Sequence, residues 1–259
     1  MSEWSAPTRL QQEWVACAIA AAASRFIPVP LLDDLVKERA TRTAVSRTWQ
    51  AHGRPPADPV IRLLAGDSSG GVRGWLRSAS RVPLAVMLYP WRKVTRIVTS
   101  VHGVTSDLVG VLLLARSVDR CLTAGWFTSS DPETLRQNAQ LVRRAHDQAV
   151  AGVDLRLLEH SIGMGLRQVS GLQAQAQRYA RRAFGRPAGQ GRPGQLADGA
   201  APPPRTQTEA GVETGVREVE AVLDRPEVTD LLSTLDRRFD TALASLAGTR
   251  SARPTDRSA

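Results

Sequence analysis

Three acidic residues, Asp33, Asp34 and Glu38, have the types and spacing of a divalent-cation site. Asp34 and Glu38 are four residues apart, so on a helix their carboxylates share one face, and carboxylate oxygens are preferred ligands of Mg²⁺ and Ca²⁺. Basic residues at positions 37, 39 and 42 stand beside them and can neutralise them. Acidic side chains in the first turn of a helix also interact favourably with its dipole. The pattern therefore predicts a structural joint at the start of a helix, with cation binding as the alternative.

The glycine-rich stretch GDSSGG, residues 66–71, invites comparison with two catalytic motifs. Its second serine departs from the spacing around a serine-protease nucleophile, and no histidine and aspartate context for a triad accompanies it. Val72 and Arg73 follow it, where a phosphate-binding loop has Lys and Ser or Thr. The stretch is predicted to be a loop.

Histidines and cysteines show no metal-binding or catalytic spacing. His146 and His160 are 14 residues apart, which on one helix separates them by about 21 Å, too far for one metal ion. Cys17 and Cys121 are the only cysteines, too few for a disulfide framework or a metal cage. We therefore expect a non-enzymatic protein without a cofactor or metal.

The segment GWLRSASRVPLAVMLYPWRKVTRIV, residues 74–98, combines an apolar run with flanking aromatic and basic side chains. This combination is typical of a segment that inserts into the interface of an anionic membrane. The alternative is a core element with a solvated basic rim. The predicted contact residues are Trp75, Tyr89, Trp91, Arg92, Lys93 and Arg96.

A second basic cluster consists of Arg178, Arg181 and Arg182. Near the C-terminus of a helix such charges complement the dipole, which is the structural interpretation. The functional interpretation is contact with a phosphate or an acidic partner. The aromatic residues that single-strand binders interleave with their basic residues are missing here.

These side chains are carried by a chain whose composition favours helices. Ala, Leu, Arg and Gln dominate the periodic segments, and only six residues are Tyr or Phe. The predicted fold is all-α, a multi-helix bundle with long antiparallel helices. Helices are expected over about residues 7–25, 31–50, 60–65, 94–122 and 130–184, with Ser130 as a cap and breaks near Gly152 or Gly163. The apolar seams of the last two predict an antiparallel hairpin.

Charge and composition divide the chain further. The net charge of +9 comes from a basic part, residues 1–184, whereas residues 209–240 hold nine acids against four arginines. The predicted organisation is a basic bundle (1–184), a flexible Gly/Pro-rich linker (185–208), an acidic helical appendage (209–247) and a disordered tail (248–259). The appendage is predicted to dock on the basic bundle or to bind a partner helix through Val228, Leu232, Leu235, Phe239 and Leu243.

Hydropathy favours a cytoplasmic protein, peripheral to the inner membrane. The first 26 residues make a poor signal peptide, because acid and tryptophan stand where a basic region is needed. The most apolar window, residues 97–115, is interrupted by His102 and Asp107.

The stretch AIAAAASRFIPVPLLDDLVKERATR, residues 18–42, consists of an alanine-rich helix, a proline corner and an acidic-then-basic helix. It resembles the bacterial YcjF-like and EcsC-like helical domains over about a tenth of the chain. The resemblance implies a helical, membrane-associated protein and brings no catalytic residues with it.

Charge layout and this resemblance together predict a scaffold or interaction protein. Its basic face would engage an anionic membrane surface or an acidic protein partner. One alternative is a basic protein associated with nucleic acid, whose affinity would fall steeply with salt. The other is an enzyme with a carboxylate site inside the bundle.

Overall fold

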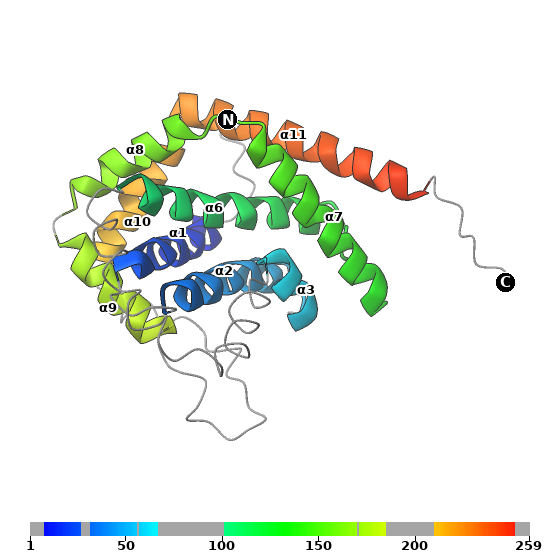
Figure 1. The fold of residues 1–259 in the computed structure, drawn as a ribbon, viewed down its shortest axis with the longest axis horizontal. Helices are drawn as coiled ribbons and strands as arrows, with labels where there is room; N and C mark the ends of the chain where they lie inside the picture. The colour runs from blue at the N-terminus through cyan, green and yellow to red at the C-terminus, as the bar shows by residue number, and fades with distance from the viewer. Residues whose placement is uncertain are drawn as a thin grey trace, which may run out of the picture.

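The structure is a computed structural model that describes residues 8–26, 32–55, 57–66, 101–169, 171–184 and 210–251. Every secondary-structure element in these ranges is a helix, which confirms the all-α bundle. Figure 1 shows α1, α2 and α6 side by side, with α8, α9 and α10 at one end and α7 and α11 reaching to the other. The elements are α1 (Thr8–Ala23), the 3₁₀ helix η1 (Ser24–Phe26), α2 (Leu32–Ala51), α3 (Asp58–Leu64), α6 (Val101–Thr123), α7 (Pro132–Ala151), α8 (Arg156–Arg167), α9 (Leu172–Phe184), α10 (Ala210–Leu223) and α11 (Pro226–Ser251).

Helix α1 lies at the centre of the bundle and contacts α2, α6, α9 and α10. Its second half is an alanine run that is buried from Ala20 to Ala23. Small side chains let neighbouring backbones approach closely, which explains how four helices can surround it. Trp14, fully buried, donates its indole N–H to Thr48 Oγ1 of α2 at 2.8 Å, so its one polar atom is satisfied.

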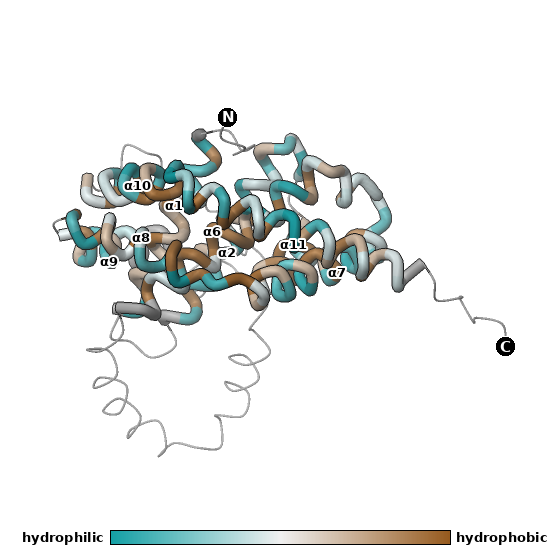
Figure 2. The backbone as a smooth tube through the Cα atoms, turned by 90° about the horizontal axis from the view of Figure 1, so that it is seen from above, coloured by the Kyte–Doolittle hydropathy of each residue, from teal (hydrophilic) through white to brown (hydrophobic). Residues whose placement is uncertain are grey.

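Helix α6 connects the two hydrophobic clusters of the core. Leu108, Val111 and Ala115 belong to the cluster around α1. Val118 and Leu122, further along the same predicted seam, belong to a second cluster with α2, α3, α7 and α11. Every residue from 111 to 119 is buried, as expected for a helix enclosed on all sides. Figure 2 shows hydrophobic stretches along α1 and α6, inside the more polar outer helices.

The turn between α6 and α7 departs from the predicted cap. Gly125 takes the left-handed conformation at φ +77°, which ends α6. Asp131, not Ser130, caps α7, and its carboxylate accepts the backbone N–H of Thr134 at 2.8 Å. Pro132 explains the shift, because a proline suits the first position of a helix and the residue before it is held extended.

The second apolar seam belongs to two helices instead of one. Residues 152–155 separate α7 from α8, where a break was predicted, and a further break at residues 168–171 separates α8 from α9. Gly171, at φ +70°, lies at this second break, whereas Gly163 lies within α8. Helix α7 packs mainly on α11 and α3, so the simple hairpin of two long helices was wrong.

The acidic C-terminal segment is part of the bundle and not an appendage, which corrects the predicted domain division. Helix α10 packs on α1, α8 and α9, and α11 packs on α7. Close approach is possible because α10 carries Gly211 and Gly215 on its buried side, where Gly215 lies against Leu172 and Ile19. The five residues of the predicted partner-binding face are buried in the chain's own core: Val228, Leu232, Leu235, Phe239 and Leu243.

Candidate functional site

The predicted contact residues fall into two groups. Trp75, Tyr89, Trp91, Arg92, Lys93 and Arg96 lie outside the described residues, so that segment stays a prediction. Arg178 is an exposed residue of α9, and Arg181 and Arg182 belong to the last turns of the same helix. Phe184 ends the helix two residues later, so the cluster stands at a helix C-terminus, as the sequence predicted.

The acidic joint at the start of α2 is organised around a residue that sequence reasoning did not select. Glu38 pairs with Arg42 at 2.5 Å, as predicted. Lys37, however, reaches Asp107 of α6 at 2.5 Å, and Arg25 of η1 binds the same carboxylate. Asp107 is buried and joins three elements through these two cations. The basic residues of this region therefore satisfy a tertiary acid as well as their helical neighbours.

An ion-pair network joins α6 to α11. The Arg116 guanidinium binds the Asp236 carboxylate at two points, Nε to Oδ1 at 3.0 Å and Nη2 to Oδ2 at 2.6 Å. Arg120 adds contacts to Asp236 at 3.3 Å and to Asp240 at 2.5 Å. The basic and acidic parts of the chain thus meet in a buried, oriented contact.

Ser117 and His146 form a pair that resembles a nucleophile and its base. Ser117 Oγ lies 3.0 Å from His146 Nδ1. Both residues are buried between α6 and α7, and burial lowers the pKa of His146 to about 4. A substrate cannot reach this pair, so its role is to satisfy two polar groups in the core.

The pair of His52 with Asp119 and the two cysteine thiols also have structural roles. His52, after α2, lies 2.8 Å from buried Asp119 of α6 and ties the two helices together. Cys17 and Cys121 are buried, and loss of solvation raises the pKa of each thiol to about 12. Both thiols are therefore protonated at neutral pH, whereas the thiolate is the nucleophilic form.

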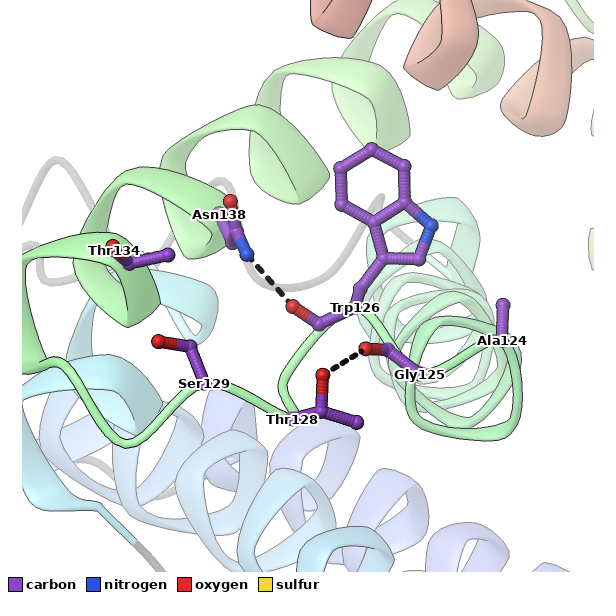
Figure 3. Close-up of a pocket in the computed structure, with 7 residues that line it drawn as sticks. All are labelled: Ala124, Gly125, Trp126, Thr128, Ser129, Thr134 and Asn138. Atoms are coloured by element: carbon purple, nitrogen blue, oxygen red, sulfur yellow. Dashed lines mark hydrogen bonds between the residues drawn. The ribbon is translucent and has the colours of Figure 1, made fainter.

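A cavity of about 390 Å³ lies beside the turn between α6 and α7 (Figure 3). Its polar side chains are engaged with the turn itself. Asn138 donates to the Trp126 carbonyl at 2.7 Å, Thr128 donates to the Gly125 carbonyl at 3.0 Å, and Thr134 donates to Asp131 at 2.5 Å. These bonds hold the turn in shape, so the cavity is part of a capping structure.

The outer surface of α8 is the strongest candidate for a functional contact. Leu157 and Met164 are 46% and 48% exposed, the highest values for large hydrophobic side chains among the described residues. They are seven residues apart, so they lie on one face. Exposed Arg156, His160 and Arg167 follow on that same face. The core residues Leu158, Ser161, Ile162 and Gly165 occupy the opposite side of the helix.

Sequence reasoning missed this face. The apolar seam predicted within residues 130–184 passes through Leu155, Leu158 and Ile162, and those residues pack inward. Leu157 and Met164 lie about 100–180° away from these seam residues around the helix. The signal that could have found them is this second apolar pair at a spacing of seven, placed among the basic residues of the polar side.

None of the helices in the described ranges is long and apolar enough to cross a membrane. No three His, Cys, Asp or Glu side chains in the same ranges are grouped so that they could hold a metal ion. Comparisons of the chain with protein-family models, with curated proteins and with solved structures found no match.

Proposed function

We propose that this protein is a non-enzymatic interaction protein that docks on an anionic membrane surface through the outer face of α8. The observation that carries the proposal is the exposed pair Leu157 and Met164 beside Arg156 and Arg167. An amphipathic helix that lies in a membrane interface needs apolar side chains that enter the acyl boundary and cations that meet the lipid phosphates. This face supplies both, on a helix whose opposite side is fixed to the core.

The magnitude of the interaction is modest. Burying the exposed half of Leu157 and Met164 contributes on the order of 1 kcal/mol each, since full burial of such a side chain contributes about 1.5–3 kcal/mol. Each arginine near an anionic leaflet contributes about 1 kcal/mol. The sum corresponds to half-saturation near about 1 mM lipid. Docking is therefore reversible, and the net charge of +9 favours encounter with the same surface.

The test is flotation of the full chain with vesicles of phosphatidylcholine alone or with phosphatidylserine, at low and moderate salt. We expect binding to the anionic vesicles only, weakened as salt rises. Leu157→Ser with Met164→Ser, and separately Arg156→Glu with Arg167→Glu, should each reduce the bound fraction at least fivefold. The matched control is Arg136→Glu with Arg144→Glu, which makes the same charge change on exposed positions of α7 and should leave most of the binding intact.

Two results would overturn the proposal. Equal losses in the α8 variants and the α7 control would mean that net charge alone drives adsorption. Absence of vesicle binding, together with DNA or RNA binding that falls steeply with salt, would place the protein in the nucleic-acid class instead.

A further inference from the structure

A polar groove between α7 and α11 stands apart from the α8 face. Its volume is about 580 Å³, and its polar lining consists of Gln148 from α7 and Thr234, Arg237, Arg238, Thr241 and Ser245 from α11. Thr234 and Ser245 are eleven residues apart along α11, so the groove runs for about 16 Å. It is long enough for about five residues of extended chain.

The two guanidinium groups of this groove are not engaged by the carboxylates nearest to them in the sequence. The acids next to them in sequence, Asp236 and Asp240, point to α6 and are held by Arg116 and Arg120. Asp147 of α7 pairs with Arg143 at 3.1 Å. Within the described part of the chain, no carboxylate forms an ion pair with Arg237 or Arg238. Among the described residues, the hydrogen bond of the Arg237 side chain is the one that its Nη2 donates to the Thr234 hydroxyl at 3.0 Å.

Arg238 also offsets the partial negative charge at the C-terminus of α7, which would repel an anion from the groove. The C-terminal turn of α7 ends at the groove, and a helix C-terminus carries partial negative charge. The Arg238 guanidinium lies against Gly152, the residue that ends α7, so closely that a Cβ on that glycine would clash with it. This cation offsets the dipole and leaves Arg237 to face a ligand.

The remaining polar groups favour a phosphate over a carboxylate. The Gln148 amide and the Ser245 hydroxyl are donors without a hydrogen-bond partner in the described ranges, and both line the same groove as Arg237. A phosphate monoester carries a charge of about −1.5 to −2 at pH 7 and three acceptor oxygens, which matches the Arg237 cation and the donors beside it. Arginine is the residue best suited to bind it at two points.

We propose that this groove binds a phosphorylated serine or threonine in an extended segment of a partner protein, with Arg237 as the principal phosphate contact. The length of the groove fits a peptide better than free phosphate. Its two apolar lining residues, Ala149 and Ala242, offer no aromatic ring on which a nucleotide base could stack.

The test is fluorescence anisotropy of the full chain with a labelled seven-residue peptide, Ala-Gly-Ala-phosphoSer-Ala-Gly-Ala, and its unphosphorylated twin. We expect saturable binding of the phosphopeptide, at least tenfold weaker binding of the twin, and competition by inorganic phosphate at millimolar concentration. Arg237→Gln should weaken binding at least tenfold and Ser245→Ala about threefold. Arg217→Gln, an exposed arginine of α10, is the control and should not change it.

Three outcomes would contradict the proposal. The first is equal affinity for the two peptides, and the second is phosphopeptide binding that does not respond to Arg237→Gln in a variant that keeps its thermal transition. The third is failure of the peptide combined with Arg237-dependent binding of vesicles that carry a phosphoinositide, which would make the groove a lipid headgroup site. The α8 variants Leu157→Ser with Met164→Ser should bind the phosphopeptide normally, so this test and that of membrane docking are independent.

Discussion

Arg116 and Asp236 are 120 residues apart in the sequence and meet in a two-point ion pair between α6 and α11. Both side chains are nearly inaccessible, at 8% and 11% exposure. A buried pair of this kind contributes little net stability, since desolvation opposes the attraction, but the loss of one partner leaves an uncompensated buried charge. We therefore expect the pair to act mainly on specificity, by favouring one position of the acidic C-terminal helix on the basic part of the bundle.

Asp236→Asn should reduce the free energy of unfolding by about 3–5 kcal/mol, because the buried Arg116 guanidinium loses the carboxylate that it binds at two points. The measurement is urea denaturation followed by circular dichroism. Replacing both partners, Arg116→Met with Asp236→Leu, should recover most of this loss. Asp240→Asn is the control, since Asp240 is exposed, and should cost under about 1 kcal/mol. Equal losses in the free energy of unfolding for Asp236→Asn and Asp240→Asn would contradict a larger cost of breaking the buried ion pair.

Cleavage between α9 and α10 should leave the bundle assembled. Helix α10 is held by contacts outside the cleaved stretch, since Gln175 Oε1 in the first turn of α9 accepts the backbone N–H of Gly211 at 2.5 Å, and α10 packs directly on α9. A protease site placed within residues 185–209 should yield two fragments that co-elute in gel filtration. Deleting 185–259 altogether should unfold the remainder, because it strips the cover from α1 and α7. Fragments that separate while both stay helical would restore the appendage predicted from the sequence.

How far the fold could be predicted from the sequence depends on the kind of signal. Helices with a regular apolar seam, such as residues 104–122 of α6, were located because the period is local information. The sequence left the placement of α10 and α11 open between docking on the basic bundle and binding a partner helix, because a Gly/Pro-rich stretch looks the same whether it separates domains or returns to the same core. Only long-range packing, such as Gly215 against Ile19, distinguishes the two.

Gly215→Ala should destabilise the protein by about 1–3 kcal/mol, because the new methyl group would lie 3.0 Å from Leu172 Cδ1 and 3.3 Å from Ile19 Cδ1. Gly110→Ala on α6 is the matched control. A Cβ there meets nothing within 4 Å, so the substitution should stabilise the helix by about 0.5–1 kcal/mol. The measurement is thermal unfolding of both variants. A stabilising effect of both substitutions would contradict the close contact between α10 and α1.

Protonation of His146 should oppose folding below pH 6.5. Burial lowers its pKa from 6.5 to about 4 in the folded chain, so between these values the unfolded chain takes up a proton that the folded chain excludes. Stability is fully present above pH 6.5 and falls by up to about 1.4 kcal/mol per pH unit towards pH 4. Compared with the unmodified chain, His146→Gln should lose about 2 kcal/mol less between pH 7.5 and pH 5.

The measurement for this prediction is the free energy of unfolding in urea at several pH values. His160→Gln, on the exposed face of α8, is the control and should keep the slope of the unmodified protein. If His146→Gln keeps that slope as well, other titrating groups govern the acid sensitivity.

The candidate site could be predicted only in part, for a physical reason. Sequence patterns identify which residues are apolar or charged, but a surface contact depends on which apolar residues remain uncovered. Leu157 and Met164 were overlooked in the sequence because the inward-facing seam of their own helix gives a stronger apolar pattern. Val228 and Phe239 of α11 appeared available for a partner helix, although the packing of α11 on the rest of the core buries them. The choice between core and contact face is made by neighbours that are distant in the sequence.

The position of α1 has a consequence for biosynthesis. Two of its neighbours, α9 and α10, are translated much later than α1 itself. At about 5–20 residues per second, the 200 residues between Ala23 and Leu223 take roughly 10–40 s. Throughout that interval the apolar surface around Trp14 and Ile19 lacks part of its final cover. The core around α1 is therefore complete only after the helix that carries Gly215 has been made.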